Sequence, residues 1–123
     1  MSTPRALEPR TRTFSAAVAA DGWLHVSGQI ASDAEGRVDG DCGTQASRCL
    51  EKIDRLLEAA GSTRADVVKL TAYLVHAGDF PQYQAAKAAW VAQPAPAGTA
   101  VVVAALLVPG ARIEIEAIAR LPR

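Results

Sequence analysis

Two glutamates near the carboxyl end of the chain are the first residues whose type and spacing could do chemistry. Glu114 and Glu116 alternate with Ile113 and Ile115 in the segment ARIEIEAIAR. Such alternation predicts a strand with both carboxylates on one face. Carboxylates placed in this way either form a solvated or ion-paired face, or move protons in a reaction. We interpret Glu116 in the first sense, and the residues alone leave Glu114 open.

A second polar pair lies in the segment WLHVSGQ. His25 and Ser27 alternate with Leu24 and Val26, so the pair is predicted to share a strand face. Histidine titrates near neutral pH and could supply acid–base chemistry, but a lone histidine on a strand is more often structural. A serine at a strand end usually bonds to backbone. We therefore predict a structural His25 and a weakly site-lining Ser27.

The two cysteines are the remaining reactive side chains. Cys42 and Cys49 are seven positions apart. In a helix this spacing places them ~10 Å apart along one face, which is too far for a disulfide. We interpret them as packed or capping thiols, rather than as a disulfide, a nucleophile or a metal site, and we predict no metal.

Composition and charge limit the classes of function. The chain has 123 residues and is 50% hydrophobic, which predicts one domain over residues 1–123. Its 13 basic and 13 acidic residues balance and form no basic stripe, so we predict no nucleic-acid partner. No apolar run approaches the ~20 residues of a membrane span, and the N-terminus lacks a signal-peptide core. We expect a cytoplasmic protein with no membrane partner.

The elements that must position these side chains follow from hydrophobic periodicity. Residues 1–11 are predicted to form a loose arm. Residues 14–30 are predicted to form two strands around the turn Asp21-Gly22, which is a strong hairpin signal. A polar loop follows, and then a helix with one apolar stripe. The stripe consists of Ala46, Cys49, Leu50, Ile53, Leu56, Leu57 and Ala60, at three- and four-residue steps.

Turn and cap signals set the limits of two helices. Asp41 or Thr44 is predicted to cap the first helix, and Gly61 suits the left-handed position after its end. Asp79 is predicted to cap the second helix, with Pro81 in its first turn. Pro94 and Pro96 then stop it, and its inner stripe consists of Phe80, Tyr83, Ala86 and Trp90.

Three further strands complete one mixed sheet. Residues 65–75 are nearly continuously apolar, which is typical of a central strand covered on both faces. Residues 99–107 and 111–120 are the last two strands, and they either pair as a hairpin or leave a gap for another strand. This order of elements predicts an α+β sheet with both helices on one face. The segment VVVAALL is apolar on both alternating faces, so we expect a homo-oligomer to cover the other face.

The chain resembles the RidA family, also called YjgF. The segments FSAAV, LHVSGQI, LEAAGSTRADVVKLTAYLVHAGDF and RIEIEAIA carry the resemblance, from about Phe14 to Ala119. It implies a chorismate-mutase-like fold and a homotrimer whose sheets face the trimer core, with ligand sites in the clefts between subunits. It also implies hydrolysis of reactive enamines and imines, such as 2-aminoacrylate and 2-iminopropanoate, to a 2-keto acid and ammonia without a cofactor.

The resemblance also implies a set of site residues. Glu114 matches the glutamate that handles the attacking water, and Ser27 in SGQ is in place. Three other positions carry different residues: Phe14 stands at a cleft tyrosine, Gln84 at an asparagine and Ala100 at a cysteine. The resemblance thus places one catalytic acid beside a cleft of substrate-binding positions, namely Phe14, Ser27, Gln84, Gly98 and Ala100.

Gly98 is the departure that matters most. The family's arginine stands in a P-A-R-[ST] motif, where its fork binds the substrate carboxylate through two parallel hydrogen bonds. The matching text is PAGT, with Gly98 at the arginine position, and no arginine occurs between Arg64 and Arg112. Loss of the fork costs on the order of 10³-fold in rate. Gly98 therefore argues against ordinary 2-imino acid deaminase activity.

Three functions remain open, and so does the question whether the chain is an enzyme. The leading hypothesis is a divergent RidA-family protein that binds a small metabolite lacking the usual 2-imino carboxylate, with Glu114-assisted chemistry on an imine, enamine or related electrophile in a specialised pathway. The second is retained deaminase activity, with Arg10, Arg12, His25 or water compensating for the missing arginine. The third is a non-catalytic trimer for ligand sensing, chaperone-like holding or protein interaction.

Overall fold

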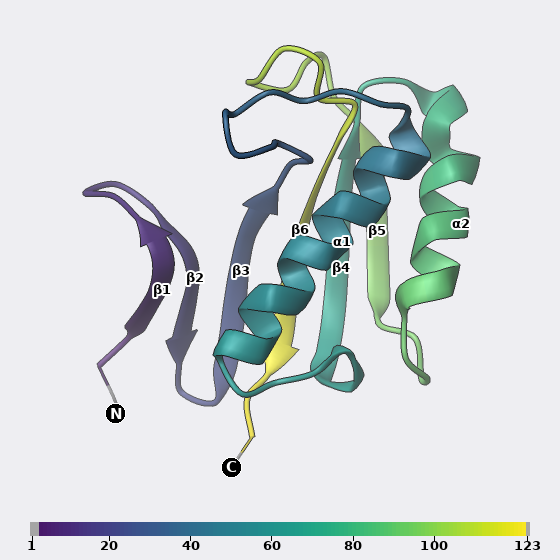
Figure 1. The fold of residues 1–123 in the computed structure, drawn as a ribbon. Helices are drawn as coiled ribbons and strands as arrows, with labels where there is room; N and C mark the ends of the chain where they lie inside the picture. The colour runs from purple at the N-terminus through teal and green to yellow at the C-terminus, as the bar shows by residue number, and fades with distance from the viewer. Residues whose placement is uncertain (1–2, 123) are drawn as a thin grey trace.

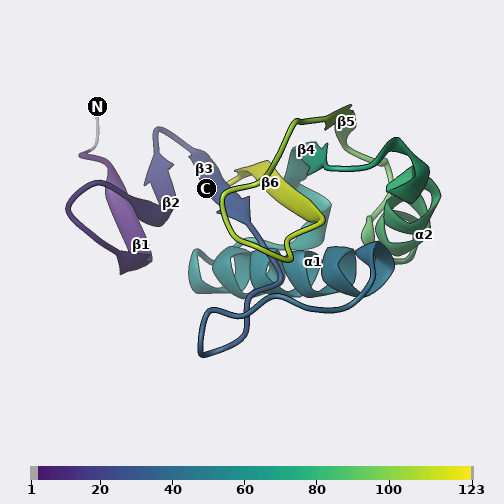
Figure 2. The same cartoon turned by 90° about the horizontal axis from the view of Figure 1, so that it is seen from above.

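A single mixed sheet with two helices on one face forms the described part of the chain, residues 3–122 of a computed structural model (Figure 1). The strand order is β1-β2-β3-β6-β4-β5. Seen from above, α1 and α2 both lie beneath the sheet (Figure 2). The elements are β1 Arg5–Arg10, β2 Ser15–Ala20, β3 Trp23–Gln29, α1 Cys42–Ala59, the short 3-10 helix η1 Arg64–Asp66, β4 Val67–Leu74, the short 3-10 helix η2 Ala77–Asp79, α2 Phe80–Trp90, β5 Ala97–Val102 and β6 Ile113–Arg120. The predicted α+β fold class is confirmed.

The predicted hairpin is present as β2 and β3. Ala20 pairs with Trp23, so the turn between them contains only Asp21 and Gly22. Both turn residues have positive φ, 52° and 87° respectively. This is the backbone conformation that a two-residue hairpin turn requires, and Asp-Gly is one of the few pairs that adopt it readily.

The N-terminal segment differs from the prediction. The loose arm predicted over residues 1–11 is wrong for Arg5–Arg10, which form β1 and pair antiparallel with β2 from Arg5↔Ala19 onward. The outer edge of β2 offers unpaired backbone groups that a further strand can bind. Leu7 of β1 is buried, with 6% of its surface exposed. Residues 1 and 2 of the predicted arm lie outside the described residues.

The last two strands take the second of the two predicted arrangements, because β4 lies between them. β4 pairs parallel with β5 and antiparallel with β6. The predicted strand over residues 99–107 is wrong beyond Val102, where the neighbouring strand β4 also ends, at Leu74. The amide of Val103 donates one last hydrogen bond to the carbonyl of Leu74, at 2.8 Å. β5 is thereby an edge strand, and all six of its residues are exposed.

Helix α1 follows its sequence signals. Asp41 is its N-cap, and the Oδ1 atom of Asp41 accepts a hydrogen bond from the Thr44 amide at 2.9 Å. Gly61, with φ of 77°, follows the end of the helix. The predicted stripe packs against the sheet, and Ala60 packs at its margin. Of the two possible caps, Asp41 is therefore the one used.

Helix α2 starts differently from the prediction. Asp79 precedes the helix but makes no capping hydrogen bond. Its side chain is buried, and Oδ2 accepts a hydrogen bond from Arg112 Nε at 3.1 Å. A buried carboxylate gains more from a guanidinium partner than from a helix amide. In the inner stripe, Tyr83 and Trp90 are buried as predicted, whereas Phe80 is 37% exposed.

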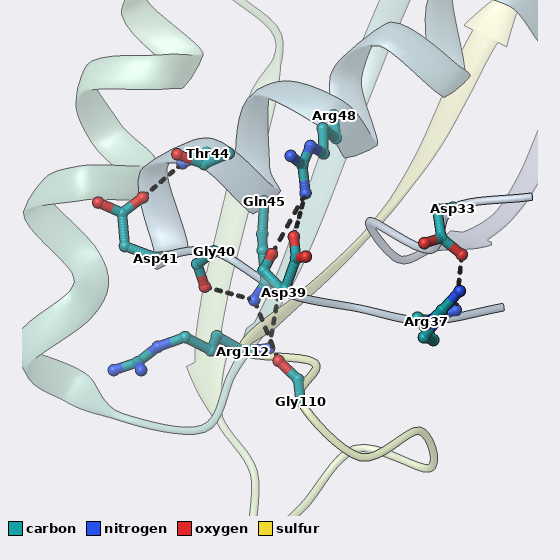
Figure 3. Close-up of polar contacts among 10 residues, drawn as sticks. All are labelled: Asp33, Arg37, Asp39, Gly40, Asp41, Thr44, Gln45, Arg48, Gly110 and Arg112. Atoms are coloured by element: carbon teal, nitrogen blue, oxygen red, sulfur yellow. Dashed lines mark hydrogen bonds and ion pairs between the residues drawn. The ribbon is translucent and has the colours of Figure 1, made fainter. Parts of the chain in front are cut away.

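A buried glutamine fixes the loops at the top of the sheet (Figure 3). Gln45 of α1 has no exposed surface. Its Nε2 donates to the carbonyls of Gly40 and Gly110, at 2.9 and 3.0 Å, and its Oε1 accepts from the Arg112 amide at 2.8 Å. One side chain thus joins the loop after β3, the helix and the segment that leads into β6. It sets where β6 begins, directly before Glu114.

The second face of the sheet is covered by no helix of the described chain (Figure 2). The prediction that β4 is covered on both faces is met on one face only, because Lys69, Thr71 and Tyr73 are half-buried while Leu70 and Ala72 are fully buried. The homotrimer that would cover the open face stays a prediction. None of the helices within residues 3–122 is long and apolar enough to cross a lipid bilayer.

Candidate functional site

Glu114 lies on the open face of the sheet, next to the backbone of the SGQ segment. The fit to Gly28 is close: a Cβ added there would stand 2.8 Å from both Cδ and Oε1 of Glu114. The side chain is half-buried, and burial, followed by the negative charge of Glu116, raises the pKa of Glu114 above its ordinary value of 4.5. A carboxylate with a raised pKa is a better proton acceptor, which suits a general base.

Two other predicted residues lie at the adjoining ends of β2 and β3. The Ser27 hydroxyl donates to the carbonyl of Ser15, at 2.6 Å, so it ties the start of β2 to β3 as a strand-end hydroxyl does. Phe14 directly precedes Ser15, and its ring is 45% exposed. We call the group of Phe14, Ser27, Gly28 and Glu114 the Glu114 surface.

The second glutamate of the pair has a structural partner. The Tyr73 hydroxyl donates a short hydrogen bond to Glu116 Oε1, and this hydrogen bond raises the pKa of Tyr73. His25 lines a shallow hollow on the same face with Lys69, Thr71 and Glu116. No described contact joins His25 to Glu114. The hydrogen bond gives Glu116 a structural partner, whereas the structural role of His25 stays a prediction.

The other three predicted residues lie together elsewhere. Gln84, Gly98 and Ala100 line a hollow of about 310 Å³ between α2 and the edge strand β5. Gln84 projects from the helix, and the two small residues come from the strand. We call this the Lys87 hollow, since its remaining lining residues are Phe80, Tyr83, Lys87 and Thr99.

Lys87 is the residue that sequence reasoning missed. Its Nζ stands 2.7 Å from the point that a Cβ on Gly98 would occupy, so an ammonium group fills the space at the position where the family places its arginine. The Nζ also lies 5.9 Å from the centre of the Tyr83 ring, within cation–π range. One signal was available: Lys87 follows Gln84 by three residues, so both share a helix face.

The electrostatics of the Lys87 hollow are simple. Within residues 3–122 no carboxylate lies within ion-pair distance of Lys87, and none lines the hollow. Burial raises the pKa of Tyr83 to about 12, so its phenol is neutral at physiological pH. The Tyr83 hydroxyl, buried among the described residues, has no hydrogen-bond partner there. Lys87 is therefore the charged group of the lining.

The two groups of predicted residues do not meet within one chain. Gly98 pairs with Leu70, and Ala100 pairs with Ala72, so the Ala100 side chain and the vacant Cβ position of Gly98 point to the helix-covered face. Glu114 pairs with Tyr73, which points to the open face because neighbouring residues of a strand alternate. A ligand that touches both Glu114 and Lys87 must therefore bind between two copies of the chain.

The other candidate reactive groups make no described contact with either place within residues 3–122. Arg10 forms an exposed ion pair with Glu8 at 2.9 Å, and Arg12 is exposed between β1 and β2. Cys42 and Cys49 are free and buried, and burial raises their pKa to about 11 and about 12, which makes them packed thiols as predicted. Among residues 3–122, no group of three or more His, Cys, Asp and Glu side chains is placed to bind a metal ion.

Known proteins resemble this chain over most of its length. A family model described as Endoribonuclease L-PSP matches residues 3–121. A RutC family protein of Pyrococcus horikoshii is 39% identical over 108 residues, which cover 86% of this chain and 85% of that protein. The human 2-iminobutanoate/2-iminopropanoate deaminase is 37% identical over 108 residues, with 86% and 78% covered.

Solved structures agree with the sequence comparison. The crystal structure of RidA from an Antarctic Psychrobacter species superposes with a TM-score of 0.83 and 34% identity, over 91% of each chain. A YjgF family member from Neisseria meningitidis gives a TM-score of 0.87 with 30% identity, over 98% of this chain and 97% of that one. The chain therefore belongs to the RidA/YjgF family, as its sequence motifs indicate.

Proposed function

We propose that this protein hydrolyses the C=N bond of a small imine, or of the enamine that is its tautomer, in clefts between copies of the chain. The observation that carries the proposal is the Glu114 carboxyl group, half-buried against Gly28 with a raised pKa. Relatives of similar length carry the name 2-iminobutanoate/2-iminopropanoate deaminase, which supports the same reaction class here.

The reaction needs one group that can take up and return a proton. Water adds to the carbon of the C=N bond while Glu114 accepts a proton from it, and the electron pair of the π bond moves to nitrogen. Glu114 returns that proton to the nitrogen, which gives a neutral carbinolamine. Glu114 then accepts the proton of the carbinolamine hydroxyl group and passes it to the nitrogen while the C=O bond forms and the C–N bond breaks. The sum is imine plus water giving a carbonyl compound plus ammonia, and one carboxyl group serves each of these proton transfers.

Assembly is part of the proposal. The open face of the sheet and the edge strand β5 carry exposed apolar side chains, among them Trp23 at 42%, Val101 at 41% and Val102 at 53%. Burying such surface against a second copy is favourable. It would also bring a Glu114 surface against a neighbour's Lys87 hollow. We propose a homotrimer, in keeping with the family, as the assembly that forms these clefts.

Two other functions receive less support. A ribonuclease would need basic surface for a phosphate backbone, and the balance of 13 basic and 13 acidic residues provides no excess. A purely ligand-binding protein would not need Glu114 as a proton acceptor. Such a protein would tolerate loss of that group, which separates it from the proposed enzyme.

The test is hydrolysis of imines generated in situ, with ammonia release measured above the buffer rate. 2-Iminopropanoate and the neutral imine propan-2-imine are compared as substrates. Glu114→Gln should lower turnover by about 10²- to 10³-fold, since general acid–base groups contribute about this much. Glu51→Gln, which changes an exposed acid on α1, is the control and should match the parent.

Two results would contradict the proposal. One is a parent protein that accelerates hydrolysis of neither imine. The other is a Glu114→Gln variant whose turnover stays within about twofold of the parent, well short of what loss of a general base costs. The oligomeric state of each variant is measured alongside by light scattering, so that a lost cleft is not mistaken for a lost base.

A further inference from the structure

The positive charge of the Lys87 hollow comes from a helix and enters the space beside a strand glycine. Nζ of Lys87 lies 2.7 Å from the Cβ position of Gly98, closer than any real Cβ would allow without a shift. A residue with a side chain at position 98 would therefore displace the ammonium group. Gly98 and Lys87 are coupled: the glycine provides the room that the lysine occupies.

The surroundings make this ammonium available to a ligand. Within residues 3–122 it has no carboxylate partner, and the hollow it enters is open between α2 and β5. Its neighbours there are the Tyr83 ring and the Gln84 amide, and neither neutralises a charge. A lysine ammonium has three N–H donors, and none of them is bound to a described residue of the hollow.

We propose that Lys87 is the anion-binding residue of this protein's cleft and replaces in function the arginine that Gly98 lacks. The inference rests on the proposed function, and it names the substrate class: an imine that carries one compact anionic group, such as a carboxylate. Lysine binds an anion as a point charge rather than through a planar fork, so the anion lies against the α2 side of the hollow. The positive charge that is missing from β5 at Gly98 is then supplied by Lys87 on α2.

A structural role for Lys87 is the competing explanation, because its ammonium also lies over the Tyr83 ring at 5.9 Å. In that case the residue would stabilise α2 and leave ligand affinity unchanged. The two roles differ in a measurable way, since a cation–π contact does not depend on the charge of the ligand whereas an anion site does.

The test measures binding of pyruvate, the keto acid product of 2-iminopropanoate hydrolysis, to the full-length protein by calorimetry. Pyruvamide, which has no charge, is the matched ligand. Lys87→Met should weaken pyruvate binding by about 10- to 100-fold, the loss expected for a hydrogen bond to a charged group, and should leave pyruvamide binding unchanged. Lys87→Arg, which keeps the charge, should retain most of the pyruvate affinity.

Arg55→Met is the control. It removes an exposed positive charge from α1, at a residue that does not line the Lys87 hollow. Its pyruvate affinity should equal that of the parent. Pyruvate binding that survives Lys87→Met, or that falls equally with pyruvamide, would overturn the inference, as would a parent that binds both ligands equally.

The inference and the proposed function can fail separately. Glu114→Gln should still bind pyruvate, since the carboxyl group is not part of the anion site. If Lys87→Met abolishes pyruvate binding while Glu114→Gln hydrolyses imines normally, the anion site stands and the proposed mechanism falls. If Glu114→Gln is inactive while Lys87→Met binds pyruvate as the parent does, the mechanism stands and the anion site falls.

Discussion

The Glu114 surface and the Lys87 hollow hold their functional groups in different ways. Glu114 projects from a central strand and is pressed against the backbone at Gly28, at 2.8 Å from the position of an added Cβ. Lys87 reaches from a helix across to an edge strand, and its long side chain stops beside Gly98. The proposed proton acceptor packs against the backbone of the adjacent strand, whereas the proposed anion-binding group reaches across a hollow from a helix.

This difference explains why the position of the positive charge in the sequence can vary, whereas the position of the carboxyl group cannot. A general base must keep its position relative to the substrate, because any displacement moves the reacting atoms out of line. A point charge requires only that some cation reach the same volume. A lysine on α2 can therefore stand in for an arginine on β5, and the change leaves Ser27, Gly28 and Glu114 in place.

Among the variants that test this comparison, Gly28→Ala should have the largest effect on imine hydrolysis. The added methyl group would force the Glu114 carboxyl group aside, at little cost in stability because only the end of a flexible side chain moves. We expect imine hydrolysis to fall about 100-fold, as a displacement of about 1 Å can cause, with an unchanged melting temperature. Gly78→Ala, at a glycine with open space around it, should behave as the parent. Full activity in Gly28→Ala would mean that the close fit does not position the acid.

A smaller effect is expected in the Lys87 hollow. Gly98→Ala places a methyl group where the ammonium stands and should weaken pyruvate binding by about threefold to fivefold, a part of the loss expected when the charge is removed. In the Lys87→Met background, the same change should have no effect, since nothing charged remains to be displaced. Calorimetry on the four proteins gives the coupling. Independent, additive effects would break the proposed link between the two positions.

The smallest effect concerns pH. The charge of Glu116 is the second cause, after burial, of the raised pKa of Glu114. Glu116→Gln removes a neighbouring negative charge, so the pKa of Glu114 should fall, and the acid limb of the pH–rate profile should move to lower pH. Rates at the plateau should be unaltered. A limb that stays in place or moves to higher pH would show that Glu116 does not influence the base.

Features of the fold that depend on neighbouring residues follow from the sequence, whereas those that depend on distant contacts do not. The Asp21-Gly22 turn, the Asp41 cap and the stripe of α1 depend on residues within a turn or two, and all are confirmed. The β1 strand was missed because its pairing partner β2, rather than its own composition, makes it a strand. The Asp79 cap failed because Arg112, 33 positions away, binds that carboxylate instead.

The candidate site also depends on contacts between residues that are distant in the sequence. The family resemblance placed five substrate-binding positions in one cleft, and the Lys87 hollow contains three of them, Gln84, Gly98 and Ala100. The sequence did not indicate Lys87, because the proximity of α2 to β5 arises only in the folded chain. Nor could it show that Glu114 and Gly98 point to opposite faces. That follows only from the pairing of both strands with β4.

The opposite orientation of the two halves has a genetic consequence. Each chain gives Glu114 to one cleft of the proposed trimer and Lys87 to another, so no cleft is built from a single polypeptide. Two chains that are each inactive, one damaged at Glu114 and the other at Lys87, would rescue one another in a mixed assembly, because some clefts would draw both intact halves. The two lesions would then complement one another, although both lie in one gene.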